Sequence, residues 1–448
     1  MRHHPFLRLL AMLAALTLFV AACGDDDDEA EESTSSTAEP GGEEEGGGEG
    51  PDLSGESLEV AAVWTDAEQE RFEMVLDAFQ ERTGAEVTYT ATGDSMDVFL
   101  EGRIARGGAP DVAIVAQPAL LQQLAGAGNL AALNEDVVAA VEGSYDEGLL
   151  EALSVDGTLY GVPFKTANKS LLWYNISALE DAGVEPPATW EEFQAALQTV
   201  SDSGVTPLSI GADVGWPLTD WFENVLLWTA GSDFYNQLAT GEAQWDSPEV
   251  RAALEAMAQV WKDEWVVGGL QGAASTTFSE SATQLVTEPA GFMYEGDFVA
   301  GQITGEGVGE IGTDVDFVPF PAIGEEGEAG DRLVLGGDFP VLLEDTEAGQ
   351  ALMEFLASAE AQEIWAAEGG FLSSNTELDT SVYPDEVTQR AAEMIQSAQE
   401  TAFDLSDSVP PELGATEGQG LWNIFIDFLT DPSDIDGTVA ALTAAAGA

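Results

Sequence analysis

The sequence has little of several residue types on which catalysis and metal binding depend. Its 448 residues include one cysteine, Cys23, and two histidines, His3 and His4. A single cysteine cannot form a disulfide within the chain. Beyond residue 23 there is neither a thiol nor an imidazole, which excludes Ser-His-Asp and Cys-His catalysis and the usual zinc sites. Only carboxylate, Lys, Tyr or Ser/Lys chemistry remains available. Our expectation is that the chain has no catalytic residues, no metal and no cofactor.

Positive charge is also scarce. The chain has 12 Lys and Arg against 83 Asp and Glu, a formal net charge of −71. Such a surface repels phosphate backbones and disfavours anionic ligands, so we expect no nucleic-acid partner. The acidic run Asp25 to Asp28 lacks the turn-forming glycine of a calcium loop, and we interpret it as a solvated spacer.

The N-terminus has the pattern of a secretory signal. A positive start and an apolar stretch from Leu7 to Val20 precede Ala21, Ala22 and Cys23. The stretch Val20 to Gly24 resembles the lipobox of bacterial lipoproteins, in which the signal is cut before the cysteine and the thiol is acylated. The alternative is an ordinary signal peptide with a chance cysteine. We expect residues 1–22 to be a lipoprotein signal peptide and Cys23 to anchor the chain to the outer face of the bacterial cell membrane.

The next segment lacks the residues that form a core. Residues 24–51 contain no large apolar side chain and are rich in Asp, Glu, Gly, Ser and Thr. We therefore expect residues 23–56 to form an acidic, Gly/Ser-rich, disordered tether. The roughly 400 residues that remain are enough for two lobes with separate cores.

Strand and helix patterns alternate after the tether. Leu58–Trp64, Glu86–Thr90 and Asp111–Val115 read as strands. A helix that ends near Gly84 and a second helix over Met96–Ala105 separate them. This β-α-β-α-β order predicts an α/β fold with a mostly parallel sheet and helices on both faces.

Later segments continue the alternation without an internal repeat. A capping box at Thr189 and Glu192 and the pair Ser247-Pro248 each predict the start of a helix. From Thr346 onward the chain is expected to be mainly helical. Further strands are predicted at 171–174, 291–294, 315–320 and 333–336.

Several of the 11 tryptophans lie beside polar residues at the ends of elements. Trp64 precedes Asp66, while Trp216 and Trp221 flank Asp220. Sugars bind by stacking on aromatic rings while carboxylates and amides hydrogen-bond their hydroxyls. We therefore regard these side chains as candidates for ligand binding, with burial in the core as the alternative. For three further tryptophans at helical spacing we favour the core: Trp228, Trp261 and Trp365.

Two of the three lysines lie close together. For Lys165 a fixed hydrogen-bond donor near a hinge and an ordinary surface position are both open. For Lys169 a surface position is favoured.

The order of motifs resembles a known family. Gly157 to Phe164 followed by Leu171 to Asn175, together with Ala109 to Val112 and Phe292 to Asp297, resembles landmarks of extracellular solute-binding protein family 1 of ABC transporters, which includes maltose-binding protein. Three further segments look like its α-glucoside-binding lipoproteins: 215–221, 370–372 and 414–428. The resemblance extends over nearly the whole chain from Leu58.

This resemblance implies a fold and a site. The fold would be the two-lobe periplasmic-binding-protein type II fold with three crossovers between lobes. Lobe 1 would comprise residues 57–164 and 317–338, and lobe 2 residues 165–316 and 339–448. The ligand-binding residues would be Trp64, Thr65, Asp66, Gln117, Lys165, Trp216, Asp220, Trp221, Tyr294, Glu295, Gly337, Asp338 and Phe371.

The resemblance also implies a function without turnover. A monomer would capture a small neutral carbohydrate, an α-glucoside or another oligosaccharide, and present it to the ABC permease subunits in the membrane. The α-glucoside relatives commonly have basic residues where this chain has Thr65 and Glu295. Two alternatives remain: the same fold binding a non-sugar solute such as a polyamine, or a secreted glycoside hydrolase, which needs only a carboxylate pair.

Overall fold

The computed structural model describes residues 50–288, 290–324 and 327–447. These residues belong to one compact unit of the chain, 49–448. The predicted signal peptide, Cys23 and most of the predicted tether lie outside the described residues. The last part of that segment joins the fold: Leu53 is buried, and its N–H donates to the carbonyl of Thr83 over 2.8 Å. The tether prediction therefore reached too far along the chain.

The first sheet confirms the predicted β-α-β-α-β start. Strands β1 (Ser57–Ala62), β2 (Glu86–Ala91) and β3 (Val112–Val115) are parallel, with β1 in the middle. Helix α1 (Asp66–Thr83) ends at Gly84, whose φ of 77° is left-handed, as expected for a helix-ending glycine. Helix α2 (Met96–Ile104) connects β2 to β3. Strand β3 lies between β1, to which it is parallel, and β10, to which it is antiparallel. All four of its side chains are apolar and buried, because both faces of this central strand are covered.

The second sheet has three antiparallel strands. Strand β7 (Leu171–Asn175) lies between β8 (Phe292–Glu295) and β9 (Val315–Pro319). Both predicted helix starts are confirmed, because Thr189 and Glu192 form the capping box of α7 (Trp190–Asp202) and Ser247 caps α9 (Pro248–Val260). Other helices between β7 and β9 are α6 (Ile176–Ala182), α8 (Trp216–Ala239), α11 (Phe278–Thr287) and α12 (Val299–Gly305).

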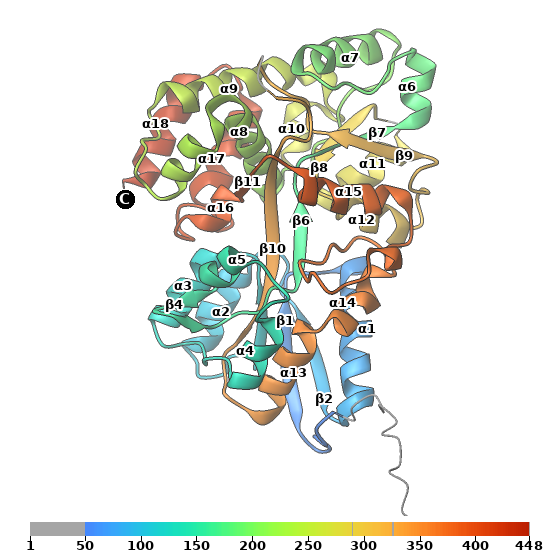
Figure 1. The fold of residues 1–448 in the computed structure, drawn as a ribbon. Coiled ribbons are helices and arrows are strands. Elements are labelled where there is room, and N and C mark those ends of the chain that lie inside the picture. The colour runs from blue at the N-terminus through green and yellow to red at the C-terminus, as the bar shows by residue number, and fades with distance from the viewer. Residues whose placement is uncertain (1–49, 289, 325–326, 448) are drawn as a thin grey trace, which may run out of the picture. The chain divides into compact units, whose positions relative to one another are not determined.

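We call the elements around the first sheet the first group and those around the second sheet the second group. Two antiparallel strands connect the two groups (Figure 1). Strand β6 (Lys165–Asn168) pairs with β10 (Arg332–Leu342), and Lys165 lies opposite Asp338. The far end of β10, Phe339–Leu342, pairs with β3 in the first sheet, while its beginning pairs with β11 (Glu400–Phe403). One long strand therefore spans both groups, and residues on β6 and β10 lie between them.

The pairings differ from the predicted lobe boundaries in two places. Residues 317–319 belong to β9 and therefore to the second sheet, although the sequence analysis placed them in lobe 1. Helices α13 (Glu347–Ala357) and α14 (Ala359–Ala366) pack on α1 and on α4 (Glu135–Val141), although residues from 339 onward were placed in lobe 2. The reason is that the end of β10 pairs with β3 in the first sheet, so the helices that follow β10 in the sequence begin beside that sheet. The other boundaries stay a prediction.

The remaining elements complete the two groups. Trp228, Trp261 and Trp365 are buried, as favoured from sequence.

Among the described residues, no helix has both the length and the apolar character that crossing a bilayer would need. The other elements are α3 (Pro118–Gly126), α5 (Glu147–Ala152), β4 (Ser154–Val155), β5 (Thr158–Leu159), a 3₁₀ turn (Asp263–Trp265), α10 (Gly269–Ala273), a second 3₁₀ turn (Thr380–Val382), α15 (Glu386–Ser397), α16 (Leu405–Ser408), α17 (Gly420–Thr430) and α18 (Ile435–Ala446).

Candidate functional site

A cavity of about 470 Å³ lies beside β6 and β10. One wall comes from the first sheet, at the ends of β1 and β3 where α1 and α3 begin. The other comes from the second group, around the starts of α8, α11 and α17. Eight carboxylate side chains but only two ammonium groups line it, so we call it the acidic cavity. The eight are Asp66, Glu68, Asp94, Asp97, Asp213, Asp338, Asp404 and Asp407.

The structure brings eight of the 13 residues predicted to bind ligand to this cavity. They come from segments that are far apart in the sequence, so only the fold brings them together. Whether they contact ligand stays a prediction. The eight are Trp64, Thr65, Asp66, Gln117, Lys165, Trp216, Gly337 and Asp338.

Five predicted residues do not line the acidic cavity: Asp220, Trp221, Tyr294, Glu295 and Phe371. Trp221 is 1% exposed and packs in the core against Tyr294 and Phe320. Five helical positions separate it from Trp216, a rotation of about 140° that turns the two rings to different sides of α8. Phe371 is likewise buried, against Phe164 and Trp365. The candidate site therefore leaves out these rings.

Three aromatic rings form a cluster on one wall. The ring centroid of Trp216 lies 5.3 Å from that of Phe278 and 5.9 Å from that of Phe298. Phe278 and Phe298 are 5.3 Å apart. All three side chains are half-buried and line the cavity. An apolar platform of this kind suits the C–H face of a sugar ring.

Asp66 begins α1 in a strained conformation. Its φ of 51° is left-handed, which is unusual for a residue other than glycine. Such a backbone costs on the order of 1–3 kcal/mol and is concentrated at functional sites. Its carboxylate Oδ2 accepts a hydrogen bond from the hydroxyl of Thr65 over 3.0 Å, and both side chains line the cavity.

Lys165 is a buried, fixed cation, which decides between the two alternatives for this residue. Its Nζ lies 2.5 Å from Glu68 Oε1 and 4.9 Å from the ring centroid of Trp365. Burial opposes its charge, but the carboxylates of Glu68 and Asp338 outweigh that effect and raise the pKa of Lys165 above its ordinary value. Burial in turn raises the pKa of Asp338 to about 6, although Lys165 works against the rise.

Lys169 contradicts the surface position favoured from sequence. Its Nζ lies 2.5 Å from Asp404 Oδ2 and 3.2 Å from Asp220 Oδ1, and both carboxylates are buried. Asp404 is 235 positions and Asp220 51 positions away along the chain, so no local sequence pattern predicts these pairs. Asp220 and Asp404 overcome the effect of burial and raise the pKa of Lys169 well above its usual value.

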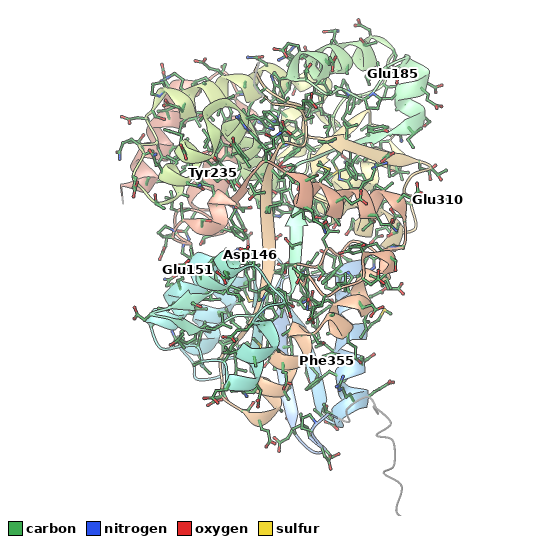
Figure 2. All side chains as sticks on the ribbon, viewed as in Figure 1. Asp146, Glu151, Glu185, Tyr235, Glu310 and Phe355 are labelled. Carbon is green, nitrogen blue, oxygen red and sulfur yellow. The ribbon has the colours of Figure 1, made fainter. Side chains whose placement is uncertain are left out.

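Carboxylate oxygens of Asp220, Glu223 and Asp404 lie within 4.8 Å of one another around this ammonium. Glu223 accepts hydrogen bonds from the hydroxyl of Tyr235 (labelled in Figure 2) and from two backbone N–H groups at the start of α16. Burial raises the pKa of Asp220 to about 8, while Lys169 and hydrogen bonds from Ser406 and the Asp407 N–H overcome burial and lower the pKa of Asp404. Protein donors serve both oxygens of Glu223 and of Asp404, while Asp220 bonds to Lys169 through Oδ1 and its Oδ2 has no partner among the described residues. Because Lys169 already supplies the positive charge there, we assign the cluster a structural role.

Tyr294 and Glu295 are buried next to the cluster around Lys169. The hydroxyl of Tyr294 donates to backbone carbonyls, those of Lys169 at 2.6 Å and Asp220 at 2.9 Å. Burial raises the pKa of Glu295 well above its ordinary value. Tyr294 and Asp220 therefore hold Lys169 at the cavity wall, which is a positioning role.

Sequence reasoning missed several lining residues. Phe278 is the first residue of α11, and the capping box of Thr277 and Glu280 was the signal that could have placed it. Phe298 caps α12 and Gln302 lies on it, in a sequence without such a motif. Asp404 and Asp407 follow β11, a strand that was not predicted. Trp422 also lines the cavity, near the start of α17, and its place in the segment 414–428, which resembles the α-glucoside-binding lipoproteins, was the available signal.

The chain was compared with known proteins. The sequence profile of the bacterial extracellular solute-binding proteins matches residues 65–363. The osmoprotective compounds-binding protein GgtB of Synechocystis sp. is 32% identical over 87% of this chain and 93% of its own length. The alpha-glucosides-binding periplasmic protein AglE of Rhizobium meliloti is 31% identical over 87% of this chain and 86% of its own.

Solved structures show the same fold. The bacterial solute receptor AcbH matches with a TM-score of 0.75 and 21% identity, over 87% of this chain and 97% of its own. A chitin oligosaccharide binding protein matches with a TM-score of 0.75 and 21% identity, over 88% and 99%. These matches confirm the predicted two-lobe α/β fold of the periplasmic binding proteins.

Proposed function

Because this chain belongs to the bacterial extracellular solute-binding protein family, we propose that it captures a neutral carbohydrate in the acidic cavity and delivers it to the permease of an ABC importer. The ligand is an α-glucoside or a related oligosaccharide. AglE, which is named for α-glucosides, supports this class, while GgtB is named for osmoprotective compounds. We further propose that the chain works as a monomer, without turnover, held at the outer face of the membrane by a lipid on Cys23.

The observation that carries the proposal is the composition of the cavity walls. Trp216, Phe278 and Phe298 offer apolar faces, and the carboxylates accept hydrogen bonds from hydroxyl groups. Both lysines are already paired with carboxylates, so they add no free positive charge to attract an anion. This lining disfavours an anion, and its aromatic faces favour a neutral polyhydroxylated molecule over a polyamine, which the excess of carboxylates would also accept.

Capture is proposed to use closure of the two walls. Contacts already cross the mouth of the cavity: the hydroxyl of Thr416 donates to Asp97 Oδ2 over 2.7 Å, and that of Ser95 donates to Glu417 Oε2 over 2.8 Å. A ligand that touches both walls favours the arrangement in which these contacts form. The permease would then recognise the closed form.

A thermal-shift panel tests the ligand class, because a ligand that binds only the folded protein raises its melting temperature. The panel contains maltose, trehalose, sucrose, glucosylglycerol, galactose and spermidine. We expect a rise with at least one neutral glucoside. A rise with spermidine alone would instead support a polyamine, and a rise with none would contradict the proposal.

The absence of turnover is tested in the same mixtures. After a long incubation, the oligosaccharides are expected to be recovered intact by chromatography. Accumulation of monosaccharides would support a glycoside hydrolase.

A further inference from the structure

A second, larger cavity of about 740 Å³ also borders β6 and β10. Side chains alternate between the two faces of a strand. On β6, Ala167 lines the acidic cavity and Thr166 the larger one. On β10, Asp338 lines the acidic cavity, whereas Leu335 and Phe339 line the larger one. The two cavities therefore lie on opposite faces of the connecting strands.

Each charged side chain that lines the larger cavity already has a hydrogen-bond partner in the protein, so we call it the neutral cavity. Its one carboxylate, Asp146, caps α5 and accepts from the N–H groups of Gly148 and Leu149 (Asp146 is labelled in Figure 2). Its one ammonium, that of Lys165, bonds to Glu68, which lines the acidic cavity. An ion bound in the neutral cavity would lose its hydration without gaining a partner.

The remaining lining has two characters. Polar side chains come from consecutive residues 373–376, of which Ser373, Asn375 and Thr376 already hydrogen-bond within the protein. The Oγ of Ser374 is buried with no hydrogen-bond partner among the described residues. Apolar side chains come from other elements, including Leu149 on α5, Ile395 on α15 and Phe403 on β11. Small-molecule sites typically have this size and this mixture of apolar surface and a few polar groups.

The position of the neutral cavity couples it to the acidic one. Rotation about β6 and β10 that narrows one cavity widens the other, because they lie on opposite faces of these strands. In this structure the walls of the acidic cavity already meet, through Thr416–Asp97 and Ser95–Glu417. A molecule that fits the neutral cavity at its present width therefore stabilises the arrangement with the acidic cavity narrowed.

We propose that the neutral cavity is a second binding site, for an uncharged amphiphile with a hydroxylated end and an apolar chain, and that its occupation raises the affinity of the acidic cavity for its ligand. The coupling rests on the proposed function, whereas the site itself does not. Thermodynamic linkage makes the effect reciprocal, so the ligand of the acidic cavity equally strengthens binding of the amphiphile.

Calorimetry with 1,2-octanediol as the probe tests the proposal on the full chain. Wild type is expected to bind the diol. Filling the neutral cavity from either wall, by Ala152→Trp on α5 or Ala392→Trp on α15, is expected to weaken that binding about tenfold or more. Ala444→Trp, on the exposed face of α18 and outside both cavities, is the matched control and should bind the diol as wild type does.

The coupling is then measured with the glycoside that gives the largest thermal shift. Saturating diol is expected to lower its Kd about fivefold, at the low end of typical allosteric coupling. No binding of the diol to wild type, equal binding to every folded filled variant, or an unchanged or larger glycoside Kd would each overturn the proposal. If no glycoside binds at all, the proposed function fails, while diol binding still decides whether the second site exists.

Discussion

At the scale of single residues, Trp216 is the aromatic side chain on which binding is expected to depend most. Its ring lies within 6 Å of two others and lines the acidic cavity. Trp216→Ala is expected to weaken glycoside binding about tenfold or more, the size of effect seen for buried aromatic anchors. Trp216→Phe keeps an aromatic face and should lose less of the affinity for the glycoside than Trp216→Ala does. Calorimetric Kd values for both variants check this, and equal Kd values for Trp216→Ala and wild type would contradict it.

Lys169 is expected to matter for stability. Lys169→Met leaves the buried carboxylate of Asp404 without its counter-ion and Asp220 without its hydrogen-bond donor, which should cost about 3–5 kcal/mol of unfolding free energy. Lys262→Met is the matched control, because Lys262 lies 3.6 Å from the Trp265 ring rather than in the carboxylate cluster, and it should cost about 1 kcal/mol or less. Urea unfolding measures both, and equal losses would contradict the role assigned to Lys169.

Residue identity alone predicted part of the site. Trp64 and Trp216 were identified because a tryptophan beside an acid at an element end is typical of sugar binding. Trp221 looked equally suitable, yet helical rotation turns it into the core. The burial of Lys169 could not be foreseen, because it depends on carboxylates from distant parts of the chain.

At the scale of elements, the starts of α8 and α17 fit together through Gly215. Its φ is 99°, and a Cβ there would lie 2.5 Å from the carbonyl oxygen of Trp422, which lines the acidic cavity. Gly215→Ala is therefore expected to cost more stability than the about 1–2 kcal/mol of a left-handed backbone alone, and also to weaken glycoside binding.

Gly128→Ala is the control for this prediction. Its φ is 73°, and the space around it is open, so it should show the backbone cost without a change in binding. Thermal unfolding and calorimetry measure the two effects. Equal losses of stability in both variants, with unchanged glycoside binding in Gly215→Ala, would contradict the proposed contact.

Elements with an apolar pattern were predictable, whereas two short polar strands were not. The first three strands, their helices and both helix caps follow from hydrophobic spacing and capping residues. Strands β6 (KTAN) and β11 (ETAF) contain few large apolar residues, unlike β3 (VAIV) and β8 (FMYE), which have the same length, and their strand conformation comes from pairing with β10. The path of β10 between the groups also explains why the lobe boundaries were misplaced.

At the scale of the whole molecule, buried acids are expected to make stability fall as pH rises. Burial raises the pKa of Asp220 to about 8, of Asp297 to about 7 and of Asp338 to about 6. The folded state therefore binds more protons than the unfolded state between about pH 4 and 8, so unfolding free energy decreases over this range. The melting temperature should be higher at pH 5 than at pH 8.5, measured in high salt to screen the surface charge.

Asp297→Asn isolates one contribution to this trend. Asp297 Oδ1 accepts from the N–H of Asn168, and the Asn side chain keeps an acceptor there. The variant should lose less stability than wild type between pH 5 and 8.5. A wild-type melting temperature that rises over this range, or the same slope in both proteins, would contradict the assignment.

The central claim is that the acidic cavity binds one neutral glycoside between its two walls. Isothermal titration calorimetry of wild type and Trp216→Ala with the glycosides of the panel tests it most directly. The account predicts one site per chain in wild type and a Kd about tenfold or more larger in the variant. A wild-type protein that releases no heat with any neutral glycoside, or a variant that binds as tightly as wild type, would contradict it.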